Sequence, residues 1–295
     1  MPVMNKLKQL YENLDTIENL PAFPAVAFEV IRLARDSTST SRDMERVIEK
    51  DPNLVSQILK VANSSFYGLP KEVTSLNHAI NLLGFLQVEN IVMVSVMLTS
   101  VKKLPLHKHF NRDKFLEHSF GCGVTARIIA NMLHLNFNSS EFSGGVMHDI
   151  GKILIDLYAP DALDEILENA YKKGISFYDS EMELYGISHA QLGAKLLSIW
   201  GLPDEIVDIV DYHHDPTKAD QPLLVSVVHV ADLLTYSEGI GFGGNYARFS
   251  LEDDVGWKLI LNEVELSKKL DVEFFTFKLF EEIEEAKQLY FKGTR

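Results

Sequence analysis

Apolar residues recur at helical spacing along most of the chain. Over residues 5–19, leucine, tyrosine and isoleucine follow one another at steps of three and four residues, which predicts an amphipathic helix. The same spacing predicts helices over 52–63, 76–83 and 88–101. Strict alternation of apolar and polar positions, the pattern typical of a half-buried strand, is nowhere sustained for long. The pattern therefore predicts an all-α fold.

Prolines and capping residues separate the helices of the first third. The prolines within 20–24 forbid continuation of the first helix, and a second helix is expected over 25–34. Ser41 is a candidate N-cap for a short third helix. Asp51 followed by Pro52 supplies an N-cap and a first helical residue, which predicts that the next helix begins there.

The remaining two thirds of the chain continue the helical pattern. Asn138 with Glu141 is spaced like a capping box and is expected to open the helix that bears His148. Other helices are expected over 113–133, 160–174, 189–200, 203–214, 223–236 and within 251–292. Leu104 and Pro105 mark the expected seam. We therefore expect two packed helical subdomains, residues 1–105 and 106–295.

The composition of the chain is that of a soluble cytoplasmic protein. Of its 295 residues 46% are hydrophobic, yet no apolar run reaches the ~18 to 20 residues that a membrane span needs. Residues 1–20 lack the apolar core of a signal peptide. A single cysteine excludes an internal disulfide and suits a reducing compartment. We expect no membrane contact.

The charge of the chain narrows the class of partner. A formal net charge of −14 disfavours binding to nucleic acid, because phosphate backbones are bound by clustered lysine and arginine. The expected partner is instead a signalling protein acting in trans, or a small phosphorylated ligand. The oligomeric state is left open.

His148 and Asp149 stand side by side in an apolar run, residues 146–153. Burying an aspartate there is costly unless it is paired. Imidazole nitrogens and carboxylate oxygens both bind metal ions, and one carboxylate can bridge two ions. Further candidate ligands lie in or at the ends of expected helices: His118, His189, His213, His214 and Asp232.

This ordered set resembles the HD superfamily of metal-dependent phosphohydrolases, which is all-α and holds one or two metals. The HDIGK sequence at 148–152 and the later paired histidine look most like the HD-GYP and HDOD branches. Segments similar to successive HDOD signatures are LPAFP at 20–24 and those at 48–54, 58–68, 79–84 and 196–203. The HDOD resemblance implies a module of signal transduction.

The resemblance also implies a division of the ligands. The main cluster would contain His118, His148, Asp149 and Asp232, and a second position would contain His189 with His213 or His214. Mixed nitrogen and oxygen ligands suit one or two divalent transition metal ions better than calcium. Iron or manganese is favoured, and zinc, nickel or cobalt is also suitable.

Other positions refine the functional hypothesis. Lys152 is a candidate catalytic residue beside Asp149, since it could stabilise a phosphate, although it could also extend to solvent. His229 is interpreted as a partner of the ligands or a core histidine, with a ligand role as the minority interpretation, and Cys122 as a buried core thiol. No Gly-Tyr-Pro element follows 213–216, so efficient hydrolysis of cyclic di-GMP is not expected.

Three functions therefore compete. The leading one is a cytoplasmic HDOD-type regulatory protein that retains a His/Asp metal centre. The alternative is an active metal-dependent phosphohydrolase acting on a nucleotide or another phosphoester. The third is a scaffold without metal, in which the histidines are only polar residues of the core.

Overall fold

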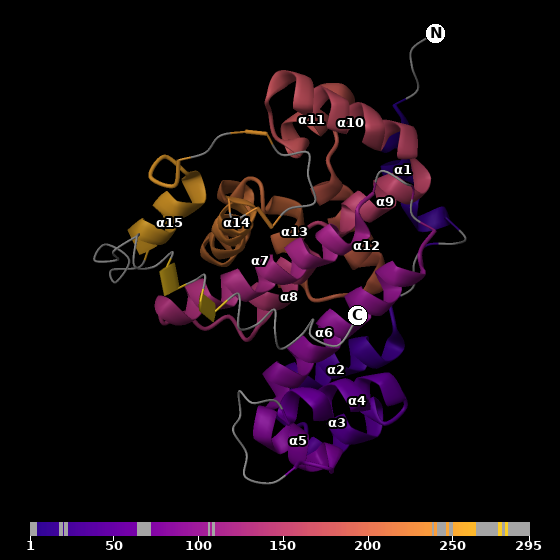
Figure 1. The fold of residues 1–295 in the computed structure, drawn as a ribbon, viewed down its shortest axis with the longest axis vertical. Helices are drawn as coiled ribbons and strands as arrows, with labels where there is room; N and C mark the ends of the chain where they lie inside the picture. Colours follow the sequence, from indigo (N-terminus) through magenta and orange to yellow (C-terminus); the bar gives the residue numbers. More distant parts are fainter. Residues whose placement is uncertain are drawn as a thin grey trace. The chain divides into compact units, whose positions relative to one another are not determined.

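The structure, a computed structural model, is built from helices (Figure 1). Within the described residues the regular secondary structure is helical, which confirms the all-α prediction. The chain divides into two compact units, residues 1–21 with 103–276 and residues 22–102 with 277–295. The described residues are 5–17, 20, 23–63, 72–105, 107, 110–237, 239–240, 246–247, 250–263, 277–278 and 281–282.

Within the described residues, the smaller unit contains the consecutive helices α2 to α6. Helix α3 packs against α2 and α5, and α4 packs against α5. Their apolar faces supply its core, and Met44, Ile48 and Ile58 are fully buried. The bounds are α2 (Ala25–Arg35), α3 (Ser41–Ile48), α4 (Pro52–Ala62), α5 (Leu76–Leu83) and α6 (Phe85–Lys103).

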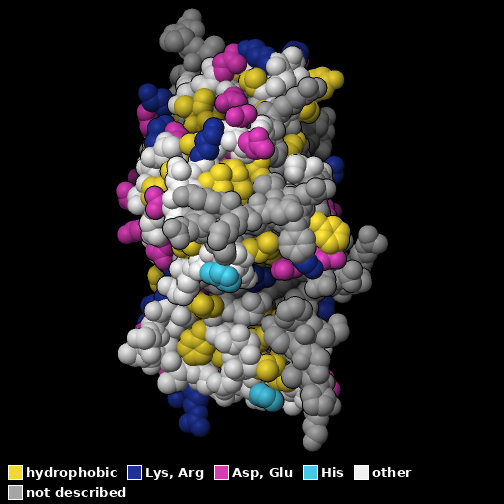
Figure 2. Space-filling model, turned by 90° about the vertical axis from the view of Figure 1, so that its left-hand side faces the viewer, with side chains coloured by type: hydrophobic (Ala, Val, Ile, Leu, Met, Phe, Trp, Pro, Cys, Tyr) yellow, Lys and Arg dark blue, Asp and Glu magenta, His cyan; other side chains and the backbone are white. Residues whose placement is uncertain are grey.

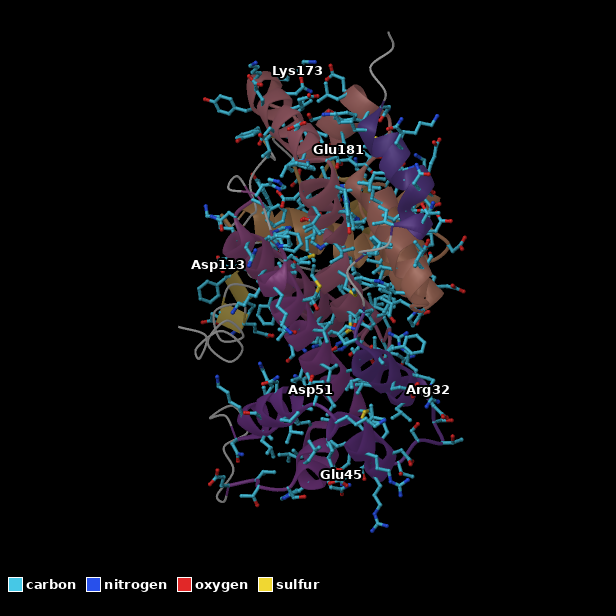
Figure 3. All side chains as sticks on the ribbon, turned by 90° about the vertical axis from the view of Figure 1, so that its right-hand side faces the viewer. Arg32, Glu45, Asp51, Asp113, Lys173 and Glu181 are labelled. Atoms are coloured by element: carbon cyan, nitrogen blue, oxygen red, sulfur yellow. The ribbon has the colours of Figure 1, made fainter. Side chains whose placement is uncertain are left out.

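The N-caps of α3 and α4 can be compared with those predicted from the sequence. Helix α4 starts as predicted, because the Asp51 carboxylate, labelled in Figure 3, accepts hydrogen bonds from the backbone N–H groups of Asn53 and Leu54. The prediction for α3 was wrong by one residue. Thr40 is the N-cap, in a reciprocal capping box with Asp43, while Ser41 is the first helical residue.

Helix α6 is longer than expected. Its 19 residues are apolar enough, by length and composition, to cross a membrane. However, 65% of its most apolar window is buried in the protein, as in a core helix of a soluble protein. The fully buried Glu89 of α6 lies 3.2 Å from the guanidinium of Arg35 on α2, a pairing that offsets the cost of burying the carboxylate.

The larger unit carries all the candidate ligands. Helix α7 packs against α8 and α14, α12 packs against α9 and α13, and α8 packs against α13 and α14. In Figure 1 these helices are grouped together in the magenta to orange part of the ribbon. The bounds are α1 (Lys6–Asn13), α7 (Arg112–Met132), α8 (Ser140–Met147), α9 (Ile150–Tyr158), α10 (Pro160–Lys173), α11 (Phe177–Tyr185), α12 (His189–Trp200), α13 (Asp204–Tyr212), α14 (Pro222–Ser237) and α15 (Val255–Glu263).

The first helix belongs to this larger unit. Helix α1 contacts α11 and α12, and the Lys195 ammonium donates a 2.6 Å hydrogen bond to the carbonyl oxygen of Tyr11. Residues 1–21 therefore group with the helices after 103, whereas the sequence assigned them to residues 1–105. The division into subdomains at residue 105 stays a prediction.

Helix α8 begins and ends differently from the expectation. Its N-cap is Ser139, which has a φ of +67° and makes no side-chain capping bond, so the expected capping box of Asn138 and Glu141 is absent. The helix ends at Met147, so His148 is not inside it. Two expected features, the glycine-rich loop 241–244 and most of the helical segment 264–292, lie outside the described residues.

Glycines bring the site-bearing helices into close contact. A Cβ atom on Gly145 of α8 would lie 2.8 Å from the Cα of Gly123 on α7. A Cβ on Gly151 of α9 would lie 1.9 Å from the carbonyl oxygen of His189 and 2.9 Å from the amide nitrogen of Gly193, both on α12. Because these neighbours are backbone atoms, the helices would have to separate to admit a methyl group.

We predict that Gly151→Ala lowers the thermal midpoint more than Gly121→Ala does. At Gly121 the nearest atom to an added Cβ is a side-chain methyl of Thr235, 2.9 Å away, which can shift more readily than backbone. Overpacking costs about 1–3 kcal/mol, and the cost at Gly151 should lie at or above the top of that range. Thermal denaturation of the two variants measures the difference. An equal or smaller loss in Gly151→Ala would contradict this account of the α9–α12 contact.

Candidate metal centre

The His148–Asp149 pair occupies the junction between two helices. His148 caps the C-terminus of α8, and Asp149 is the N-cap residue of α9, with φ −96° and ψ 7°. This bridge-region conformation turns the chain between the helices. Both side chains therefore reach the same centre from the turn between the two helices. His148 is fully buried and Asp149 is 1% exposed.

One group of side chains surrounds one oxygen of Asp149. Oδ2 of Asp149 lies 3.4 Å from Nε2 of His148 and 3.7 Å from Nε2 of His118. Oδ1 of Asp232, from α14, lies 2.9 Å from Nε2 of His118 and 3.5 Å from Nε2 of His148. These four residues are the main cluster expected from the sequence, and the structure brings them together.

A second group faces the other oxygen of Asp149. Oδ1 lies 3.1 Å from Nε2 of His189 and 4.0 Å from Nε2 of His213. Nε2 of His214 lies 3.1 Å from Nε2 of His189. All three histidines offer nitrogens within 4.8 Å of one another, so the adjacent pair at 213–214 contributes both of its rings, where the sequence left one or the other open.

The outer nitrogens of the rings are fixed by hydrogen bonds. Nδ1 of His148 donates to the carbonyl oxygen of Gly145 at 2.7 Å, and Nδ1 of His213 donates to that of Val210 at 2.8 Å. Nδ1 of His118 donates to the carbonyl oxygen of Ile240 at 2.8 Å. In the neutral rings, the form that binds a metal ion, these bonds select the tautomer with a lone pair on Nε2, the atom that points to Asp149 or Asp232.

Glu181 orients the fourth ring and was missed in the sequence. It lies on α11 in the salmon part of the ribbon (Figure 3), is fully buried, and accepts two hydrogen bonds from His189. One comes from the backbone N–H of His189 at 2.9 Å and the other from its Nδ1 at 2.6 Å. A carboxylate behind a histidine in this way is typical of metal centres. The N-cap Ser176 and the C-cap Gly186 are the local sequence signals for α11.

Lys152 is turned toward the centre. Its ammonium lies 2.6 Å from Oδ2 of Asp149 and 5.1 Å from the centroid of the Phe177 ring. Only 11% of its side chain is exposed, so the alternative in which Lys152 extends to solvent was wrong. Placed there, its charge offsets part of the negative charge of Asp149.

The surroundings set the protonation of the group. Burial raises the pKa of Asp149, but the charges of His148 and Lys152 outweigh it and hold that pKa well below its usual value. Burial lowers the pKa of His213, and the neighbouring charges of His148 and His189 lower it further. Burial and nearby histidines lower the pKa of His214 in the same way. Burial lowers the pKa of His148, but the charge of Asp149 outweighs it and holds that pKa well above its usual value. Asp149 is thus ionised and His213 and His214 are neutral, which is the protonation in which these three groups bind metal ions.

Three inward atoms of the cluster are buried without a hydrogen-bond partner in the described structure. They are Nε2 of His148, Oδ1 of Asp149 and Nε2 of His213. A buried polar atom without a partner is rare and costly unless an ion or water satisfies it. These three atoms lie in the two groups around Asp149, and in neutral imidazoles and an ionised carboxylate each carries a lone pair. The residues present therefore fit one or two divalent metal ions. The assignment of individual residues as ligands stays a prediction.

Within the described residues, the remaining histidines and Cys122 do not belong to either group of ligands. His78 and His134 are exposed, and His107 lies 3.6 Å from the buried carboxylate of Asp156, while His109 lies outside the described residues. Cys122 is fully buried in α7, as expected of a core thiol. His229 donates to the backbone carbonyl of His213, which matches its interpretation as a partner of the ligands.

Comparison with known proteins places most of the chain in one domain type. A family model described as the HDOD domain matches residues 20–216. An uncharacterised protein of Treponema pallidum (strain Nichols) is 21% identical over 229 residues, which are 76% of this chain. The chain spans 44% of the length of that protein.

Solved structures share the fold. An HDOD domain protein of unknown function from Geobacter sulfurreducens has a TM-score of 0.82 at 23% identity, covering 98% of this chain and 99% of its own. A provisionally named phosphohydrolase from Shewanella amazonensis SB2B has a TM-score of 0.67 at 22% identity, covering 96% and 98%. At these identities the likeness shows the helical architecture.

We predict that a chelator lowers the thermal midpoint of the metal-loaded protein by several degrees. An ion that binds only the folded state stabilises it by roughly 3 kcal/mol at about one hundred times its Kd. Asp149→Ala removes the shared carboxylate and should abolish this response. His78→Ala, which removes an exposed histidine, is the matched control and should keep it. A wild-type melting curve that chelator leaves unchanged would favour the metal-free scaffold.

We also predict that Glu181→Gln weakens metal binding by about 10–100-fold, the usual cost of losing a ligand's hydrogen-bond partner. The amide keeps one acceptor oxygen, so one of the two bonds to His189 is lost. Competition with a chromophoric chelator measures the affinity. Glu183→Gln makes the same change on an exposed residue two positions later and should bind as the wild type does. Equal affinities for both variants would count against the role assigned to Glu181.

Proposed function

The chain belongs to the HDOD family, and from this membership we propose that it is a cytoplasmic regulatory protein of signal transduction with a buried divalent metal centre. The observation that carries the metal centre is the position of Asp149. Its two oxygens face two groups of imidazoles, and atoms in both groups lack hydrogen-bond partners. A bound cation would offset the negative charge of the carboxylate and satisfy these atoms, since buried carboxylates are costly when unpaired.

The donor set supports a specific division of ligands. His118, His148 and Asp232 would hold one ion and His189, His213 and His214 the other, with Asp149 shared between them. Nitrogen and carboxylate oxygen donors together favour iron or manganese, and also accept zinc, nickel or cobalt. When bound, such ions supply Lewis acidity and lower the pKa of coordinated water.

The chain's own residues prepare this centre. The carbonyl groups behind His118, His148 and His213 hold the rings in one tautomer, and the Glu181 carboxylate does the same for His189. The Lys152 ammonium stays beside Asp149 and is placed to steady negative charge on a ligand. Burial excludes bulk water from most of these groups.

Enclosure favours a regulatory role over hydrolysis. The side chains of His148, His189 and His213 are fully buried, and Asp149 is 1% exposed. A phosphoester would have to approach through the more open side, where Asp232 is 15% exposed and His214 is half-buried. No Gly-Tyr-Pro element follows the paired histidines to read a cyclic dinucleotide. A centre of this kind is suited to stabilising one conformation of the protein.

An active phosphohydrolase is the second candidate, because the open side carries features of a small substrate site. The ring of Tyr178, from α11, lies 4.4 Å from the ring of His214, centroid to centroid. Lys152 and Asp149 remain the candidate catalytic residues there. The substrate would be a nucleotide or another phosphoester, drawn in by the metal.

The regulatory role requires a partner. We place a signalling protein in trans on helices α2–α5, where the HDOD-like signatures 48–54 and 79–84 lie. In the part of the face in Figure 2 that the smaller unit forms, hydrophobic side chains are visible and charged ones are few, which suits a protein better than a phosphate backbone. Hydrogen exchange of the full chain with and without that partner should show protection in α2–α5. Protection confined to the metal-bearing unit would contradict this placement.

A turnover assay separates the two functions. Iron- and manganese-loaded protein is incubated with a panel of nucleotides and cyclic dinucleotides, beside Asp149→Ala as the variant lacking the shared ligand. The regulatory proposal predicts turnover indistinguishable between the two proteins, with cyclic di-GMP left intact. Robust turnover by the wild type that Asp149→Ala loses would overturn it in favour of the phosphohydrolase.

A further inference from the structure

We propose that His229 and Asp254 are positioning residues for the second metal position, the one formed by His189, His213 and His214. The inference rests on the proposed metal centre and extends it to α15. Both residues lie beyond 216, where the family match ends. Residues that follow α14 would therefore help to position the ligands of the metal centre.

The ring of His229 joins two elements through its two nitrogens. Nδ1 lies 2.6 Å from the carbonyl oxygen of His213, and Nε2 lies 2.8 Å from Oδ2 of Asp254. Both oxygens can only accept hydrogen bonds, since one is a carbonyl and the other a carboxylate. The ring is therefore held on both sides by the protein, through the carbonyl group of His213 and the carboxylate of Asp254. It is 7% exposed, so these two contacts rather than water fix its orientation.

The carbonyl held by His229 is well placed to control two ligands. His213 is the C-cap of α13, and His214 follows it directly. The peptide that carries this carbonyl joins the two residues, so its orientation sets where both imidazoles point. The Nδ1 of His213 is already fixed by Val210, and the bond from His229 fixes the backbone on the other side of the residue.

Asp254 ties the same ring to α15. Its Oδ1 accepts a 2.8 Å hydrogen bond from the backbone N–H of Trp257 in the first turn of α15, while Oδ2 accepts from His229. Trp257 is 3% exposed, so the turn that Asp254 caps is anchored in the core. Helix α15 packs against α14 and against the short 3₁₀ helix Pro216–Lys218 that follows the paired histidines.

Gly256 makes this approach possible. A Cβ atom at position 256 would lie 2.6 Å from Cδ2 of His229, so a side chain there would displace the ring. Ile240, which lies between α14 and α15, makes a comparable contact. The carbonyl oxygen of Ile240 receives the Nδ1 bond of His118, a ligand of the first position. Residues after α14 thus hold the ring of His118 directly at the first position, and at the second position they act on His213 through His229.

Two kinds of variant test the proposal in the full chain. Asp254→Asn keeps the size of the side chain but has one acceptor oxygen, so it cannot serve both His229 and Trp257. Gly256→Ala leaves both residues in place and pushes on the ring. Asp253→Asn is the matched control, because it makes the same chemical change on the adjacent, exposed residue.

Stepwise titration of the chelator-treated protein with Co²⁺, followed by visible absorption and by metal analysis, resolves the two positions. His214→Ala and His148→Ala serve as references for loss at the second and the first position. We expect the wild type and Asp253→Asn to bind two ions. Asp254→Asn and Gly256→Ala should keep the step that His214→Ala keeps, and bind the other ion about 10–100-fold more weakly.

Two results would overturn the proposal by itself. One is an Asp254→Asn titration that matches the wild type at both steps. The other is an equal weakening of both steps, which would mean that the pair only supports the fold. If the wild type binds no Co²⁺ at all, the proposed metal centre fails and the positioning role fails with it, so the two failures are distinguishable.

Discussion

The structure of the larger unit depends on a carboxylate that is almost completely buried. Asp149 is 1% exposed and has a lysine and four imidazoles within 4.0 Å. Isolated, such a charge would oppose folding by several kcal/mol. Helix α9 supplies Lys152, α7 and α12 supply His118 and His189, and the C-terminus of α13 supplies His213. Helix α14 adds a second carboxylate, Asp232, beside His118 and His148. The same contacts therefore stabilise the fold of the unit and form the candidate metal centre.

Close packing of helices sets the distances in this centre. The contact of Gly123 with Gly145 brings α7 to α8, and so His118 to His148, while that of Gly151 with the backbone of α12 brings Asp149 to His189. Polar partners behind the rings then remove the remaining freedom of rotation. Rigid support of this kind is what a metal ion with fixed bond lengths requires.

The spacing of apolar residues was sufficient to predict most helices, because α4, α5 and α12 have clear stripes and local caps such as Asp51 and Ser188. It could not locate the break between His148 and Asp149, since no proline marks it within an apolar run. Glu181 was also out of reach, because an acidic residue in a polar helix looks solvent-exposed until α11 folds over His189. The side chains gathered around Asp149 were expected because their order resembles that of the HD superfamily, and contacts between distant helices bring them together.

The most direct test of the metal centre is a crystal structure of the protein grown with iron or manganese, with anomalous diffraction recorded at the absorption edge of that metal. The account predicts two anomalous peaks, one on each side of Asp149. The first would be bound by His118, His148 and Asp232, and the second by His189, His213 and His214. Crystals of the metal-treated protein with no peak beside Asp149 would contradict it.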